Sequence, residues 1–256
     1  MKNILNNDEV KNIIEKNEGY YSIIELNDVL YLNNKLYTKI ECLQNLHNLK
    51  TLYLNNNALE KIEGLECCIN LIALYLNCNQ IKRIENLNNL IRLRILNLED
   101  NNIFVIENLE CLDCLEDLNL SNNCLGSKGS PNTSILHKNK KIYILNLSNN
   151  QINEDILDNL LMLENLSILY LMNNPILLKY NNYRKLFIYK LKSLTFLDYK
   201  PIKTDERRCV EAFFEGGPLK EQEVMQKIER QKKLQHRNSI ECIISITKII
   251  LKKYMK

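Results

Sequence analysis

A segment of 22 residues recurs along this chain, and the recurrence limits the possible fold more than any other feature. Four copies share the period and begin at Leu49 (LKTLYLNNNAL), Leu71 (LIALYLNCNQI), Leu93 (LRILNLEDNNI) and Leu115 (LEDLNLSNNCL). A weaker copy precedes them around Leu30, and two copies with longer spacing start at Ile142 (IYILNLSNNQI) and Leu166 (LSILYLMNNPI). A fixed period of this length predicts a stack of coils, in which each coil buries its apolar side against its neighbours.

Within each copy, leucines alternate with polar or aromatic residues, as in Leu52-Tyr53-Leu54. This alternation predicts a short strand whose leucines point inward and whose intervening side chain lies on the other face. Apolar residues later in the copy, such as Leu59 and Ile62, then return the chain across the far side. The pattern resembles the leucine-rich repeat over about residues 27–198. The resemblance implies an α/β solenoid with short parallel strands on the concave face, turns or short helices on the convex face, and helical caps.

An asparagine follows the strand of each copy, at the position where the chain turns. A side-chain amide there has donors and an acceptor that can satisfy free backbone groups of adjacent coils. These asparagines are therefore interpreted as structural residues: Asn57, Asn79, Asn101, Asn123, Asn150 and Asn174.

The segments that flank the repeats differ from them, as expected for the ends of a solenoid. Residues 1–26 are predicted to form an N-terminal cap that contains a helix with Asp8 as its N-cap. The end of the 27–198 region is predicted to form a C-terminal cap from a helix and a last strand. Residues 199–218 are predicted to extend this cap. Residues 126–140, which contain glycine, serine and proline, are interpreted as a surface loop inside the array.

Residues 219–256 are predicted to form a basic helical tail. From Lys220 to the C-terminus, ten Lys and Arg residues accompany four Asp and Glu residues, whereas the whole chain has a net charge of +3. A basic tail can bind nucleic acid, acidic lipid or an acidic partner, and a solvated helix is the simpler interpretation.

The sequence contains no recognisable catalytic, cofactor or metal motif. With six glycines, it has neither GxGxxG nor GxxxxGK[ST], and its three histidines are far apart. Cys111 and Cys114 form a lone CxxC pair that fits the repeat phase, so zinc is not expected. The first residues are charged where a secretory signal is apolar, and no apolar run reaches about 18 residues. These observations predict a cytosolic or nuclear, non-enzymatic protein without cofactor, metal or membrane partner. We also expect a monomer.

The exposed face of the predicted sheet is the first candidate binding surface. Tyrosine offers a large contact area and a hydroxyl group at modest entropic cost, so a row of tyrosines beside acidic residues can receive a protein partner. The alternative is that Tyr and Asn simply tolerate an exposed strand. The candidate residues are Tyr31, Tyr53, Tyr75, Asn97, Asn119, Asn146 and Tyr170, with Glu99 and Asp117 beside them.

A second candidate surface follows the repeats, in the segment DERRCVEAFFEGG. It suits a short helix that begins near Asp205 and ends at Gly216-Gly217. Such a helix either extends the cap or docks a partner. The candidate partner-binding residues are Arg207, Glu211, Phe213 and Phe214.

This segment and the cap before it resemble the dynein axonemal assembly factor 1 family. The matching positions are Asn182-Tyr183-Arg184-Lys185, Leu197-Asp198, Pro201-Ile202, Arg207, Cys209, Glu211-Ala212, Phe213 and Gly216-Gly217. The resemblance implies a factor for motile cilia and flagella that assists cytoplasmic preassembly of axonemal dynein arms, with dynein chains and chaperones as partners. Phe213 stands where the family usually has tryptophan.

Two other classes of protein share the repeat. One is a generic leucine-rich repeat adaptor, such as a phosphatase regulator, which does not require the segment after the cap. The other is a ribonucleoprotein scaffold that uses the basic tail. The acidic residues of the sheet face disfavour nucleic acid on that face.

Overall fold

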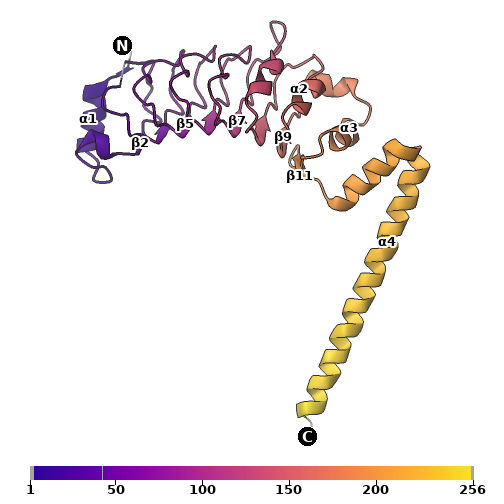
Figure 1. Cartoon of the computed structure of the whole chain (residues 1–256). Helices are drawn as coiled ribbons and strands as arrows, with labels where there is room; N and C mark the ends of the chain where they lie inside the picture. The colour runs from indigo at the N-terminus through magenta and orange to yellow at the C-terminus, as the bar shows by residue number, and fades with distance from the viewer. Residues whose placement is uncertain (1–2, 42, 255–256) are drawn as a thin grey trace. The chain divides into compact units, whose positions relative to one another are not determined.

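The computed structural model describes residues 3–41 and 43–254, and Figure 1 shows their course. Side chains are described for these residues up to 244, except that of residue 242. The chain divides after Pro201 into two compact units, which are described separately below.

A nine-stranded sheet, counted over the described residues, runs through the first unit in the order β11-β10-β9-β8-β7-β6-β5-β4-β2. Consecutive strands from β2 to β10 pair in parallel, and the central leucines pair with one another, as Leu52 does with Leu74. The coil strands are β2 (Val29–Tyr31), β4 (Thr51–Tyr53), β5 (Ala73–Tyr75), β6 (Ile95–Asn97), β7 (Asp117–Asn119), β8 (Ile144–Asn146) and β9 (Ile168–Tyr170). Each coil therefore contributes three residues to one sheet, as the 22-residue period predicts.

The core lies between this sheet and the returning convex segments. Leu52, Leu74 and Leu96 in the strands are fully buried, and so are Ile62, Ile84 and their counterparts on the convex side. Burial of one such side chain contributes about 1.5–3 kcal/mol, so the stacked leucines supply the main driving force for folding.

The N-terminal cap consists of β1 (Ile4–Leu5), which pairs with β3 (Lys39–Ile40), and helix α1 (Asn7–Glu15), followed by the 3₁₀ helix η1 (Ile24–Leu26). Val10 and Ile14 are the buried residues of α1. The prediction that Asp8 caps this helix is wrong. Asn6 is the N-cap, and its side chain accepts a hydrogen bond from the Glu9 amide at 2.9 Å. Asp8 lies in the first turn, where the positive end of the helix dipole favours a carboxylate.

Residues 126–140 were predicted to form a surface loop, and this prediction is wrong for the part that carries a buried 3₁₀ helix. Residues 127–130 are exposed, but Pro131, Thr133 and Leu136 are buried, the last two in the 3₁₀ helix η2 (Thr133–Lys138). Pro131 and Leu136 supply apolar side chains to the convex wall, which shorter turns form in other coils. The next coil carries the short helix α2 (Leu157–Leu161) on the same face.

The C-terminal cap contains the 3₁₀ helix η3 (Pro175–Lys179), helix α3 (Tyr183–Lys190) and strand β10 (Phe196–Leu197). Phe187 and Ile188 of α3 are buried. A further strand, β11 (Lys200–Pro201), pairs with β10 in antiparallel fashion. Asp198 and Tyr199 make the turn between these strands with φ of 47° and 61°.

The second unit is helix α4 (Thr204–Tyr254), which bends at two glycines. Gly216 and Gly217 have non-helical backbone angles, and φ of Gly217 is 74°, a conformation that glycine adopts without steric cost. The predicted helix stop at these glycines is thus a break between two helical arms. Lys232 of the second arm forms an ion pair with Asp205 of the first at 2.7 Å. The last two residues of the predicted basic tail lie outside the described residues.

Candidate functional site

The six asparagines at the strand ends form a continuous ladder that joins each coil to the one before it. Asn101 is representative, because its Nδ2 donates to the carbonyl oxygens of Leu76 and Leu98 and its Oδ1 accepts from the Ile81 amide at 3.0 Å. The same pattern of contacts holds for Asn57, Asn79, Asn123, Asn150 and Asn174. All but Asn57 are buried. Asn57 is partly exposed.

The residue before each ladder asparagine has a left-handed backbone. Five of these six residues are Asn or Asp, which tolerate positive φ better than other residues with a side chain. Cys78 is the exception, with φ of 57°. The full set is Asn56, Cys78, Asp100, Asn122, Asn149 and Asn173.

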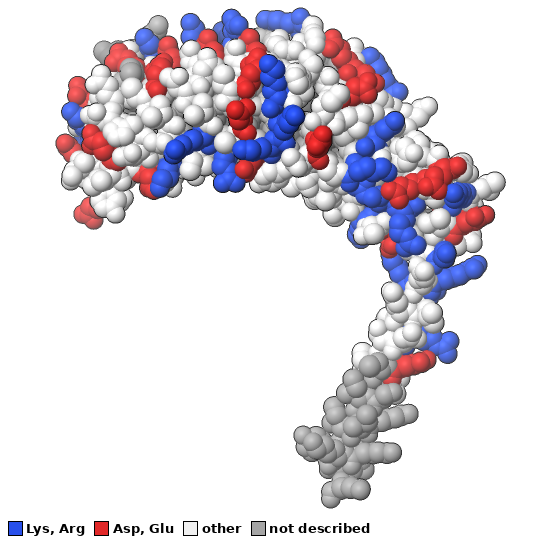
Figure 2. Space-filling model, in the orientation of Figure 1, with Lys and Arg blue, Asp and Glu red and all other residues white. Residues whose placement is uncertain are grey.

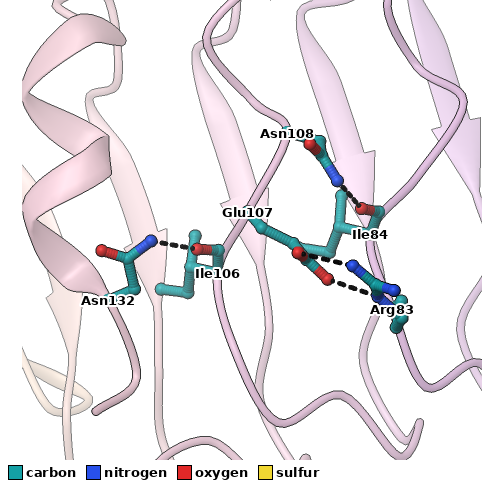
Figure 3. A network of polar contacts seen from close by, with 6 residues as sticks. All are labelled: Arg83, Ile84, Ile106, Glu107, Asn108 and Asn132. Atoms are coloured by element: carbon teal, nitrogen blue, oxygen red, sulfur yellow. Dashed lines mark hydrogen bonds and ion pairs between the residues drawn. The ribbon is translucent and has the colours of Figure 1, made fainter.

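A second asparagine ladder runs along the convex side, and the sequence reasoning missed it. Asn108 Nδ2 donates to the Ile84 carbonyl at 2.7 Å, and Asn132 repeats the contact one coil later with Ile106 at 3.1 Å (Figure 3). Asn86 makes the same bond to Ile62. All three asparagines have φ between 56° and 59°. The 22-residue spacing of Asn86 and Asn108 is the signal that could have revealed them.

An ion pair beside this ladder joins the same two coils. Arg83 contacts both carboxylate oxygens of Glu107, at 2.9 and 3.1 Å (Figure 3). The Arg83 side chain is 67% exposed, so we expect this pair to add little to stability. Figure 2 shows that both signs of charge are spread over the visible face of the repeat array.

Three tyrosines stack on the concave face at its N-terminal end. The Tyr31 and Tyr53 rings are 4.7 Å apart, and the Tyr53 and Tyr75 rings are 4.6 Å apart and nearly parallel. This stacking follows from the register, in which the three residues are direct neighbours on β2, β4 and β5. Tyr31 is 52% exposed, so one end of the stack is open to solvent. The three rings therefore form one continuous stack across three strands.

One residue from each coil strand forms a row on the concave face, called the concave row below: Tyr31, Tyr53, Tyr75, Asn97, Asn119, Asn146 and Tyr170. The middle of this row is polar, and its side chains form hydrogen bonds with neighbouring groups of the protein. Asn97, Asn119 and Asn146 each turn back and accept the amide hydrogen of the residue two positions later. Asn119 also donates to the Glu99 carboxylate at 3.1 Å. These side chains are therefore held in fixed positions on the exposed side of the sheet.

A second aromatic cluster lies at the C-terminal end of the row. The Tyr170 ring is 5.8 Å from the Phe196 ring and 4.9 Å from the Tyr199 ring. Burial raises the pKa of Tyr170, with smaller contributions from Tyr199 and Asp117. The sequence reasoning named Tyr170 but neither of its two aromatic neighbours, because these come from the hairpin of the cap.

Asp117 begins strand β7 and is half-buried on the concave face. Burial raises the pKa of its carboxyl group, which forms no hydrogen bond or ion pair with any described residue. The concave face thus combines two aromatic clusters, a fixed polar centre and one unpaired acid.

The four candidates after the cap all lie in the first arm of α4. Arg207, Glu211 and Phe213 are half-buried, and Phe214 is 39% exposed. The Phe213 and Phe214 rings are 5.4 Å apart and nearly perpendicular. These residues belong to the second unit, so we treat them as a surface separate from the concave row.

Within the described part of the chain, no group of three or more His, Cys, Asp or Glu residues is arranged to hold a metal ion. No described helix combines the length and apolar character that a membrane span needs.

A sequence model of the leucine-rich repeat family matches residues 74–229, more than half of the chain. This chain belongs to the leucine-rich repeat family. Solved leucine-rich repeat structures agree with the fold. An internalin from Listeria monocytogenes superimposes with a TM-score of 0.54 at 23% identity, covering 76% of this chain and 58% of the internalin. A leucine-rich repeat protein from Leptospira interrogans gives 0.50 at 27% identity, covering 66% and 48%. The predicted fold class is confirmed.

Sequence relatives of this leucine-rich repeat chain confirm the resemblance to the dynein axonemal assembly factor 1 family. Human dynein axonemal assembly factor 1 is 36% identical over 107 residues, which cover 41% of this chain and 15% of the human protein. A leucine-rich repeat-containing protein of Chlamydomonas reinhardtii named ODA7 is 38% identical over 79 residues, which cover 30% of this chain and 18% of that protein. These matches span less than a fifth of either relative.

Proposed function

We propose that this chain is a non-enzymatic interaction scaffold that assists the preassembly of axonemal dynein arms in the cytoplasm of cells with motile cilia or flagella. The similarity to proteins named dynein axonemal assembly factor 1 carries this proposal. Its proposed partners are axonemal dynein chains and the chaperones that fold them. A repeat solenoid suits this task, since it presents a long surface while its own core stays closed.

The concave row is the proposed partner-binding surface. Tyr53 and Tyr170 mark its two aromatic clusters, and aromatic side chains are enriched among residues that dominate binding energy. The asparagines between the clusters are already held by hydrogen bonds within the sheet, so ordering them on binding costs little conformational entropy.

The first arm of α4 is a second proposed contact surface. Phe214 offers an exposed aromatic ring next to Phe213, in the segment that carries the most specific part of the resemblance. In this proposal the arm adds contacts to a complex whose main surface is the concave row.

The proposal is tested by tagging the full chain in a flagellum-forming cell, purifying it from the cytosol and identifying the proteins that accompany it. We expect axonemal dynein chains and chaperones, with reduced recovery when Tyr53 and Tyr170 are both replaced by serine. The matched control replaces Tyr143, an exposed tyrosine outside the concave row, by serine. Recovery of a phosphatase or a splicing particle without dynein chains would overturn the proposal.

A further inference from the structure

The first residues of the coil strands form a second row on the concave face, beside the concave row. Asp117 is the one acidic residue in this second row, and its other members are uncharged. The first residues of the coil strands pair directly across the sheet, and Asp117 stands between Ile95 of β6 and Ile144 of β8. Side chains two apart on a strand lie on the same face, so Asp117 lies beside Asn119 in the proposed binding surface. The row continues at its ends as Val29, Thr51, Ala73, Ile168 and Phe196.

The other charged groups near this position are already paired. Arg94, which precedes Ile95, forms two bonds to Glu116, at 2.9 and 2.7 Å. The Glu99 carboxylate accepts hydrogen bonds from Asn119 and Asn122. Asp117 alone among these acids lacks a partner among the described residues, although it is flanked by apolar side chains that remove water from it. A half-buried carboxylate without a partner carries an uncompensated desolvation cost.

The surroundings of Asp117 indicate what would offset this cost. The Asp117 charge contributes to the raised pKa of both Tyr75 and Tyr170, so the carboxylate lies within electrostatic reach of both aromatic clusters. A guanidinium group can bond both oxygens of a carboxylate and can stack on aromatic rings, whereas an ammonium group does so less well. A nucleic-acid backbone would place phosphate next to this acid and be repelled.

We propose that the concave face receives a protein segment that inserts an arginine side chain against Asp117 and lays apolar neighbours on Ile95 and Ile144. This inference rests on the proposed function, because it names the chemistry that the concave surface recognises. The inference predicts that the partner segment contains an arginine within an apolar stretch and is not purely hydrophobic.

The test selects a random displayed peptide library on the full chain and on its Asp117→Asn variant. We expect the unmodified chain to enrich peptides with an arginine flanked by apolar residues, and the variant not to enrich them. The best peptide is then synthesised with arginine and with citrulline, which keeps the shape but lacks the charge. Binding of the arginine peptide should weaken about tenfold or more in Asp117→Asn, as expected for loss of a charge-assisted hydrogen bond. The citrulline peptide should bind both chains equally.

Two controls separate the possible failures. Asp113→Asn removes an exposed acid from the same coil and should leave binding unchanged. Peptides that depend on Tyr53 and Tyr170 but contain no enriched arginine would overturn the Asp117 inference and leave the concave surface intact. Recovery of no peptide that depends on Asp117, Tyr53 or Tyr170 would overturn both the inference and the proposed binding surface.

Discussion

The Tyr183 hydroxyl of α3 donates a hydrogen bond to the Asp198 carboxylate at 3.0 Å. The other carboxylate oxygen of Asp198 accepts the amides of Leu171 and Met172 at 2.7 and 3.0 Å. Asp198 therefore ties the cap helix to backbone donors just beyond β9, the last three-residue strand of the array. Arg184 strengthens the same corner by donating to the Leu197 carbonyl at 3.0 Å. These positions are among those that carry the family resemblance, and their geometry gives them a role in closing the solenoid.

Replacing Tyr183 by phenylalanine removes the hydroxyl donor and leaves the aromatic contact with Phe187. We expect the free energy of unfolding to fall by about 1–2 kcal/mol, because a hydrogen bond to a charged group is lost. Urea denaturation measures the change. Tyr143→Phe, at an exposed position, is the control and should shift the midpoint little. Equal midpoints for Tyr183→Phe and the unmodified chain would contradict the closing role of this pair.

The same pair predicts a pH dependence. Burial, together with the charge of Asp198, raises the pKa of Tyr183 to about 12 from its ordinary value of 10.0. The contribution of the protonated Tyr183 hydroxyl to the free energy of unfolding is fully present below the pKa of tyrosine in the unfolded chain. It is lost as the pH rises from about 10 to about 12. Stability measured over this range should decline more steeply in the unmodified chain than in Tyr183→Phe. Parallel declines would show that Tyr183 does not contribute to the loss.

Asn101→Leu tests the ladder at the strand ends. The substitution leaves buried backbone groups of Leu76, Leu98 and Ile81 without their partner, which we expect to cost about 1–3 kcal/mol. Asn102→Leu changes an adjacent, exposed asparagine and is the matched control. The two denaturant midpoints should differ clearly, and an Asn101→Leu midpoint equal to that of the control would rule out this role for the ladder.

The convex ladder makes two contributions that substitution can separate. Asn108→Gly keeps the left-handed backbone available but removes the bond to Ile84, whereas Asn108→Ala loses both. We expect stability to fall in the order Asn, Gly, Ala, with a total loss of about 1–3 kcal/mol. Thermal unfolding of the three proteins gives the order. An alanine variant as stable as the glycine variant would mean that the backbone conformation carries no cost there.

Cys78 occupies a left-handed position that asparagine or aspartate fills in the other coils. Cys78→Asn should stabilise the chain by about 0.5–1 kcal/mol, because asparagine tolerates this conformation better. Cys124→Asn, at a cysteine outside the left-handed set, should give no such gain and controls for loss of a thiol. A lower midpoint for Cys78→Asn would indicate that the contact of the thiol with Asp100 matters more than the backbone.

The sequence predicts the parts of the fold that repeat. Leu52 and Asn101 are recognisable because each recurs at a fixed phase, and periodic burial leaves a periodic pattern. Asn132 was missed because the longer coil around it shifts it out of phase with Asn108, and a left-handed backbone is not visible in the residue type alone. Asp8 and Asn6 are both good N-cap residues, so the local rule could not choose between them.

In the candidate site too, the sequence predicts the contacts that repeat from coil to coil and does not predict those that arise from tertiary structure. The positions of the tyrosine stack follow from register alone, since Tyr53 and Tyr75 share one phase. The cluster of Tyr170 with Phe196 and Tyr199 depends on a hairpin that breaks the repeat, so periodicity does not predict it. The isolation of Asp117 is likewise a tertiary property, because it depends on Arg94 and Glu116 bonding to each other.

The most direct test of the central proposal counts dynein arms on axonemes by electron tomography in a flagellate that lacks this protein. We predict that arms are missing, that the full chain restores them, and that a chain with Tyr53→Ser and Tyr170→Ser restores them poorly although it accumulates to the same level. A complete set of arms in the absence of the protein would contradict the proposed role in dynein arm assembly.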